Sequence, residues 1–294
     1  MSYRVLTDSA SNLTPQDAEK YGIEIVPFTF SMGGKDFKCY VPGTDQDEEL
    51  KKFYELMRVK ADIRTSMINA DRMLNAFETV FEKGEDVLFI GISGQISGTM
   101  QAARMAADEA LERHPERNCV VVDSLAASLG EGMLAIHAAA LRDKGLTIYE
   151  TAIALETLKM KLRQEFTVND LFFLKRGGRV SSLSAFAGSM LGIKPMLYGS
   201  DAGRIELAGK VRGRSNSIAA LADSLAKNIF SKEGLICIAH GDCEADAQLL
   251  RDMIVSRTGA EDFLIRCMDL CTGAHAGPGA LAVFYFSKTG RTAF

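Results

Sequence analysis

Strand-like runs rich in Val, Ile and Phe alternate along this chain with amphipathic runs of helical period. Val87 to Ile92, for example, precedes the helical run Met100 to His114, and Cys119 to Val122 precedes Leu129 to Arg142. Parallel strands need a crossover connection, which is usually a helix. The alternation therefore predicts an α/β fold with a largely parallel sheet.

The same patterns place the other elements. Thr14 to Tyr21 is expected to form a helix, with Thr14 as its cap and Pro15 at the first helical position. In the first half we also expect strands at 3–7 and 23–30, a hairpin through Gly33-Gly34 into 37–41, and helices over 45–60, 69–83 and 147–164. In the second half we expect a hairpin of 195–198 with 204–210, helices at 215–229 and 244–257, and strands at 235–239, 263–268 and 281–286.

A length of 294 residues favours two domains. The pattern changes near Glu165, so we expect the domains to span residues 1–164 and 165–294. The net charge is −4 and no long basic block is present, which argues against nucleic-acid binding. No secretion signal opens the sequence and no apolar run approaches membrane-spanning length, so we expect a cytoplasmic protein that is not embedded in a membrane and makes at most transient contact with one.

The cysteines and histidines allow one metal-site hypothesis, a zinc cluster of Cys237, His240, Cys243, Cys267 and Cys271. It lacks a CxxC pair, and Cys237 falls inside an apolar strand run. Buried structural thiols are favoured instead, and neither a metal nor a cofactor is expected.

The segment from Gly91 to Thr99 is rich in glycine and hydroxyl side chains and leads directly into a helical run. A helix start exposes unpaired N–H groups, and Ser93, Ser97 and Thr99 add hydroxyl donors. Because the segment contains no lysine, it differs from the phosphate loop of nucleotide hydrolases and predicts a weakly charged anion site. The alternative is that Ser97 or Thr99 only caps the helix.

Other polar segments belong with this loop or carry positive charge. Thr65-Ser66 is either a capping turn or a second hydroxyl pair, while Asp8 and Asp123 each follow a predicted strand. His275 lies in a loop rich in glycine. Arginines flanked by glycine occur at 175–179 and 210–214 and suit carboxylate or phosphate, or a partner surface.

In this order the motifs resemble the DegV family of bacterial fatty-acid-binding proteins. The resemblance rests on Thr7-Asp8-Ser9, Arg64-Thr65-Ser66, Ile96-Ser97-Gly98-Thr99, Val122-Asp123-Ser124, Leu129-Gly130-Glu131-Gly132, Leu174 to Val180, Lys194-Pro195, Gly203 to Ile205, Lys210 to Gly213, His240-Gly241 and His275 to Gly279. Two departures lie near the expected head-group site. Met67-Ile68-Asn69 follows Thr65-Ser66 where the family commonly has Gln-Pro-Ser, and Gly94 replaces the second serine of a Ser-Ser pair.

The resemblance implies a three-layer α/β/α N-terminal domain that carries the hydroxyl loops, and a C-terminal domain with a mixed sheet that covers the acyl chain. One long-chain fatty acid would lie between the domains. Thr65, Ser97 and His275 would bind its carboxylate, supported by Ser66, Ser93 and Gly98. Arg176 and Arg212 would form part of a basic docking surface.

The resemblance also implies a partner, because members of this family present the bound fatty acid to a separate kinase. The kinase makes acyl phosphate for phospholipid synthesis, and the binding protein itself performs no chemistry. The rival hypothesis is a serine-type lipid hydrolase or acyltransferase with Ser97 as nucleophile and His275 as base, although the sequence has no G-x-S-x-G nucleophile elbow. A binder of another amphiphile remains a third reading.

Overall fold

The computed structural model describes residues 2–42, 47–180 and 192–291, and the chain divides into two compact units. The first unit consists of Met1–Gln46 and Asp62–Lys159, and the second consists of Asp47–Ala61 and Met160–Phe294. The segment 47–61 thus belongs to the second unit, although both flanking segments belong to the first. A single boundary between residues 164 and 165 does not describe this excursion.

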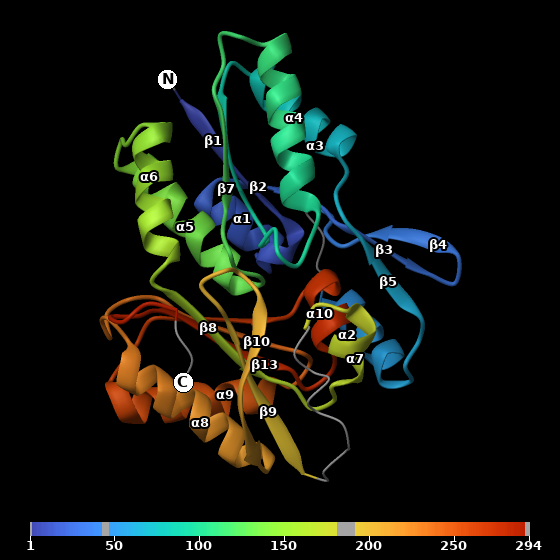
Figure 1. Ribbon diagram of the computed structural model, residues 1–294, viewed down its shortest axis with the longest axis vertical. Coiled ribbons are helices and arrows are strands. Elements are labelled where there is room, and N and C mark those ends of the chain that lie inside the picture. The colour runs from blue at the N-terminus through green and yellow to red at the C-terminus, as the bar shows by residue number, and fades with distance from the viewer. Residues whose placement is uncertain (1, 43–46, 181–191, 292–294) are drawn as a thin grey trace. The chain divides into compact units, whose positions relative to one another are not determined.

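The first unit is built around a four-stranded parallel sheet, sheet A, in the order β2-β1-β6-β7. Figure 1 shows α3 and α4 on one face of this sheet and α1, α5 and α6 on the other. This arrangement confirms the expected three-layer α/β fold. The bounds are β1 Tyr3–Asp8, β2 Ile23–Val26, β6 Asp86–Gly91, β7 Cys119–Asp123, α1 Pro15–Tyr21, α3 Ala70–Phe81, α4 Thr99–Arg113, α5 Leu129–Asp143 and α6 Ile148–Lys159.

Local chemistry sets several of these boundaries as the sequence predicts. Thr14 caps α1 in a capping box with Asp17, and Pro15 occupies the first helical position. Every residue of β6 is buried, as expected for a central strand covered by helices on both faces. Asn69 caps α3 by accepting the N–H of Arg72.

The single strand predicted over 23–30 is wrong, because the chain forms two strands there. Pro27 offers no N–H to a sheet, and the next N–H, of Phe28, donates to the Ser9 hydroxyl at 2.9 Å. The chain then enters a separate antiparallel sheet of three strands, β4-β3-β5. Its strands are β3 Thr29–Met32, β4 Lys35–Lys38 and β5 Ile63–Ser66. The expected hairpin through Gly33-Gly34 is confirmed, and both glycines have positive φ.

The second unit contains a six-stranded mixed sheet, sheet C, in the order β10-β9-β8-β13-β11-β12. Among the strand pairs of this sheet that the structure describes, only β11 with β12 is parallel, and the predicted antiparallel hairpin is confirmed as β9 with β10. Helices α8 and α9 contribute to an apolar core with Leu221, Leu250 and Val283. The bounds are β8 Leu162–Thr167, β9 Ile193–Gly199, β10 Ile205–Arg212, α8 Arg214–Asn228, β11 Ile236–His240, α9 Glu244–Thr258, β12 Phe263–Cys267 and β13 Leu281–Phe286.

The helix predicted over 147–164 is too long, because α6 ends at Lys159 and Leu162 already begins β8. Strand β8 pairs with both β13 and β9, so tertiary pairing overrides the local helical pattern. Helix α2 (Asp47–Arg58) confirms most of the helix predicted over 45–60; residue 45 lies outside the described residues. Two short helices, α7 (Phe172–Gly177) and α10 (Leu270–Ala276), were not predicted.

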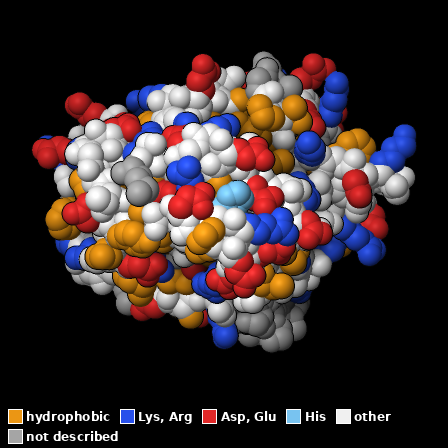
Figure 2. Space-filling model, turned by 90° about the horizontal axis from the view of Figure 1, so that it is seen from above, with side chains coloured by type: hydrophobic (Ala, Val, Ile, Leu, Met, Phe, Trp, Pro, Cys, Tyr) orange, Lys and Arg blue, Asp and Glu red, His pale blue; other side chains and the backbone are white. Residues whose placement is uncertain are grey.

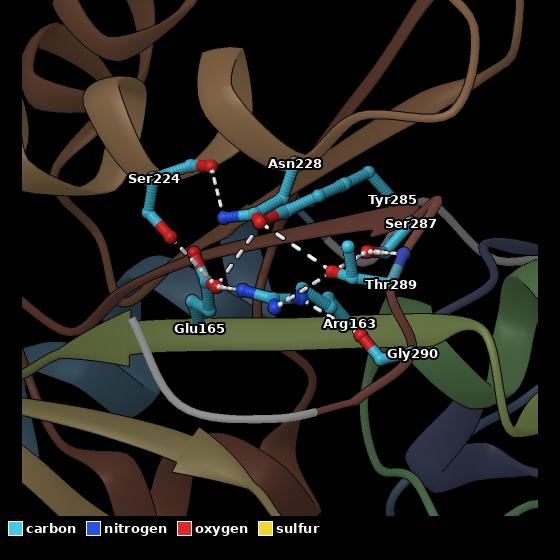
Figure 3. Close-up of polar contacts among 8 residues, drawn as sticks. All are labelled: Arg163, Glu165, Ser224, Asn228, Tyr285, Ser287, Thr289 and Gly290. Carbon is cyan, nitrogen blue, oxygen red and sulfur yellow. Dashed lines mark hydrogen bonds and ion pairs between the residues drawn. The ribbon is translucent and has the colours of Figure 1, made fainter.

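A buried polar network joins β8 to the C-terminal segment of the second unit (Figure 3). Arg163 and Glu165 form an ion pair at 3.1 Å, and their side chains are 3% and 1% exposed. Glu165 also accepts hydrogen bonds from Ser224 and Tyr285, while Arg163 donates to the carbonyl of Gly290. The network therefore satisfies Glu165 Oε1, while Glu165 Oε2 is buried without a hydrogen-bond partner in the described part of the chain.

Candidate functional site

The loop of residues 92–98, here called the hydroxyl loop, begins at the carboxyl edge of sheet A. Strands β2 and β6 both come after β1 in the chain, and they lie on opposite sides of β1 in the sheet. The carboxyl edge is therefore a topological switch point, the place where α/β sheets bind ligands. The buried carboxylate of Asp8 accepts the N–H of Ile92 at 3.0 Å and that of Ala10 at 2.9 Å. Asp8 therefore fixes the start of the hydroxyl loop at this edge.

A second carboxylate holds the middle of the hydroxyl loop. Asp123, at the end of β7, accepts the N–H of Gly94 at 3.2 Å and that of Leu125 at 2.9 Å. An added Cβ on Gly94 would lie 2.9 Å from a carboxylate oxygen of Asp123. The absence of a side chain at Gly94, one of the two departures from the family pattern, thus allows this close approach.

The hydroxyls at the start of α4 form a chain that reaches the segment after β5. The Ser97 hydroxyl donates to Thr99 Oγ1 at 3.0 Å and accepts the N–H of Thr99 at 3.3 Å. Thr99 Oγ1 also accepts the N–H of Ile68 at 3.3 Å. The fold therefore brings together two hydroxyl-bearing segments that are distant in sequence.

The other predicted residues of the first unit lie around this chain. Thr65 is half-buried and Ser66 exposed on β5, where they pair with Phe30 and Thr29, so Thr65-Ser66 belongs to a strand and does not cap α3. Ser93 is fully buried, and its hydroxyl accepts the N–H of Gln95 at 3.3 Å. Gly98 caps α4 without a side chain, and an added Cβ there would lie 2.7 Å from Met67 Sδ.

The donors left at this rim are few and uncharged. The N–H groups of Ile92 and Gly94 are already bound by the protein's own carboxylates. Within the described residues, no acceptor binds the N–H groups of Gly98, Met100 and Gln101 at the start of α4. These N–H groups suit one small carboxylate group better than a phosphate chain, and the Ser97 hydroxyl joins them when it leaves Thr99 Oγ1.

His275 lies near the end of α10, in the second unit, with its imidazole against the backbone of Gly177. A Cβ on Gly177 would overlap with His275 Nδ1. Burial, followed by the charges of Arg179 and Arg176, lowers the pKa of His275 to about 4. The imidazole is therefore neutral at pH 7 and can take part in hydrogen bonds without carrying charge.

Arg176 bonds mainly to backbone carbonyls of its own unit. Its Nη1 donates to the carbonyl of Ala61 at 2.9 Å, and its Nη2 donates to the carbonyl of Ala274 at 3.3 Å. The guanidinium also stacks on the rings of Phe172 and Phe173, each 5.4 Å from the ring centroid. These contacts join α7 to α10 and to the end of the segment 47–61.

Arg212 differs from Arg176, because it lies exposed at the end of β10. Its carbonyl accepts a hydrogen bond from Asn216, and in the described part of the chain its guanidinium has no ion pair or hydrogen bond. Over the face shown in Figure 2, acidic and basic side chains are intermixed.

The cysteine and histidine cluster can be compared with the zinc hypothesis. Burial raises the pKa of Cys243 to about 11 and that of Cys267 to about 12, and Cys237 and Cys271 are buried. Among the described residues, His, Cys, Asp and Glu side chains form no group of three or more that could hold a metal ion. Across the same residues, the helices are all too short or too polar to span a membrane.

Sequence reasoning missed the residues that hold the site in place. The sequence places Asp8 and Asp123 after predicted strands, but only the structure shows that their carboxylates accept N–H groups of the hydroxyl loop. Tyr54 contacts α10 and Met67 covers Gly98, but neither carries a local pattern that indicates this contact.

Comparison with known proteins extends over nearly the whole chain. Residues 2–288 match a family model described as an uncharacterised protein of the DegV family. A DegV domain-containing protein of Clostridium perfringens is 36% identical over 286 residues, which cover 97% of each chain.

Solved structures show the same fold. A Thermus thermophilus DegV family protein, described by its fatty acid binding, is 29% identical with a TM-score of 0.85, covering 98% of this chain and 100% of that one. The Streptococcus pneumoniae fatty acid kinase B3 protein, loaded with linoleic acid, is 24% identical with a TM-score of 0.82 and the same coverage. This second likeness shows the fold alone.

Proposed function

Since this chain belongs to the DegV family, we propose that it binds one long-chain fatty acid and presents the carboxylate to a separate fatty acid kinase. The observation that carries the proposal is the chain of hydroxyls from Ser97 to Thr99, which is joined to the segment after Thr65 at the switch point of sheet A. The description of the Thermus thermophilus relative as fatty-acid-binding supports the ligand class.

The energetics suit an amphiphile with a weakly held head group. Each buried methylene contributes about 0.8 kcal/mol, so a long acyl tail supplies most of the affinity. A buried carboxylate without partners is costly, and hydroxyl and N–H donors remove that cost without a full positive charge. Thr65, Ser97 and His275 would contact the carboxylate, while Ser66, Ser93 and Gly98 would shape the surrounding backbone.

The weak charge of the head-group site also suits presentation to a kinase. A carboxylate paired with lysine or arginine would be a poorer nucleophile toward ATP than one held by neutral donors. In this proposal the chain performs no chemistry and needs no cofactor, and the kinase phosphorylates the carboxylate. Arg212, exposed and without a described ion pair, is the cation that we assign to docking.

The proposal is tested by the Ser97→Ala variant, with Ser256→Ala as a matched control on the exposed surface of α9. Native mass spectrometry of the purified wild-type protein is expected to show a retained mass in the fatty-acid range. Ser97→Ala should lower the affinity for oleic acid about tenfold, the loss of one hydrogen bond to a charged group. Circular dichroism should show the helix content of both variants unchanged.

Three results would contradict the proposal. If the wild-type protein carries no lipid and does not bind oleic acid, a fatty acid is not its ligand. If the Ser97→Ala variant binds oleic acid as tightly as Ser256→Ala, Ser97 does not bind the carboxylate. Turnover of ester substrates by the protein alone would favour the hydrolase alternative, in which the Ser97 hydroxyl must leave Thr99 and donate to a base.

A further inference from the structure

The segment 47–61, here called the arm, is held in the second unit by contacts along its length. Arg58 forms an ion pair with Asp242 at 2.6 Å, and Lys60 forms one with Asp170 at 3.6 Å. These exposed pairs contribute little, so the buried part of the arm must supply most of the attachment.

Tyr54 is the buried anchor of the arm on helix α10. Its side chain is 0% exposed, and its hydroxyl donates to the carbonyl of Met268 at 3.1 Å, just before α10 begins. A Cβ on Gly273 would overlap with the same hydroxyl and would lie 3.3 Å from the ring of Phe53. Helix α10 therefore packs directly on Tyr54 at Gly273, which lies two residues before His275.

The arm is tied to α10 a second time through Arg176. One guanidinium nitrogen binds the carbonyl of Ala61, the last residue of the arm, and the other binds that of Ala274, next to His275. The following residue, Gly177, provides the backbone surface against which the His275 imidazole lies. Figure 1 shows α2, α7 and α10 grouped together.

We propose that Tyr54 and Arg176 are positioning residues for His275, and that they act by holding helix α10 between the arm and α7. This inference rests on the proposed function, in which His275 contacts the carboxylate. It gives Arg176 an intramolecular task besides the docking task that the family resemblance implies.

The shape of the guanidinium separates the two tasks. An arginine can donate to two carbonyls at once from a rigid fork, while a lysine carries the same charge on a single flexible nitrogen. A docking cation that attracts an acidic partner keeps most of its effect in Arg176→Lys. If Arg176 instead holds the carbonyls of Ala61 and Ala274 together, the Arg176→Lys variant loses that function.

The experiment compares Arg176→Lys and Tyr54→Phe with Arg251→Lys, on the exposed surface of α9, as a matched control. The pKa of His275 is measured in the lipid-free protein by NMR titration, and oleic acid binding is measured by calorimetry. We expect both positioning variants to raise the pKa of His275 by about one unit, because a looser imidazole is better hydrated. We expect each to weaken oleic acid binding about tenfold, consistent with the loss of one buried hydrogen bond.

Two outcomes would overturn the inference. In one, Arg176→Lys and Tyr54→Phe leave both the His275 pKa and the oleic acid affinity at the level of Arg251→Lys. In the other, affinity falls while the His275 pKa and the NMR signals of α10 stay unchanged. The NMR titration needs no lipid, so it tests the positioning of His275 even if the wild-type protein binds no oleic acid, a result that would count against the proposed function alone.

Discussion

At the scale of single residues, the site depends on polar groups that the protein has already paired. Ser97 bonds to Thr99, and His275 is a half-buried, neutral imidazole. A carboxylate ligand would therefore exchange one set of hydrogen bonds for another, and would not meet fixed charges. These donors would set the orientation of the bound fatty acid, while its apolar tail would supply most of the binding affinity.

The half-buried imidazole gives stability a defined dependence on pH. The folded protein keeps His275 neutral down to about pH 4, while the unfolded chain protonates it near its ordinary pKa of 6.5. Acidification through this window therefore favours the unfolded chain. Between pH 7 and 4 we expect the wild type to lose about 3 kcal/mol more stability than His275→Gln.

Urea denaturation of both proteins at a series of pH values measures this difference. Burial also raises the pKa of Asp269, to about 6, so this carboxyl contributes stability that grows as the pH falls. Subtracting the curve of His275→Gln removes that contribution, because both proteins contain Asp269. Parallel curves for the two proteins would show that His275 is not the titrating group.

At the scale of elements, the hydroxyl loop is shaped by carboxylates at the ends of β1 and β7, the two strands that flank β6 in sheet A. Asp8 binds the loop at Ile92, and Asp123 binds it at Gly94. The remaining donors at the start of α4 point to the same rim because the loop is fixed at both positions. The predicted strand–loop–helix order is confirmed, but no local pattern identifies these carboxylates as the supports of the loop.

Removal of the Asp8 carboxylate should make the hydroxyl loop more mobile without unfolding sheet A. Asp8→Ala removes hydrogen bonds to the N–H groups of Ile92 and Ala10. We expect the free energy of unfolding to fall by about 2 kcal/mol and the Ile92 amide to exchange faster, because its acceptor is gone. Hydrogen exchange followed by NMR measures both, with Asp36→Ala on the exposed strand β4 as the control. Unchanged exchange at Ile92 would show that the carboxylate does not hold the loop.

At the scale of the whole molecule, the two units have separate sheets and the chain passes between the units more than once. The excursion of the arm explains why a single boundary is an incomplete description. The polar network of Figure 3 belongs wholly to the second unit and fastens the segment after β13 to β8. A substitution that breaks this network should therefore destabilise mainly the second unit.

Arg163→Met tests this expectation, because it leaves the Glu165 carboxylate buried without its charged partner. We expect a loss of about 3 kcal/mol in the free energy of unfolding. Amide exchange should accelerate along β8 and β13 and stay unchanged along β6. Arg163→Met combined with Glu165→Gln should regain part of the loss, since the unpaired charge is then gone. Equal acceleration in β6 would show that the units do not respond separately.

The sequence by itself determined the α/β class, the hydroxyl loop and most helix boundaries, because periodicity, caps and glycine turns act over a few residues. It also placed Ser97 and Thr65 on segments that the fold brings together. Only the tertiary structure decided that the run 23–30 divides at Pro27, that Leu162 opens a strand, and that the arm rests on α10. These depend on partners that are distant in the chain, and no local pattern specifies such a partner.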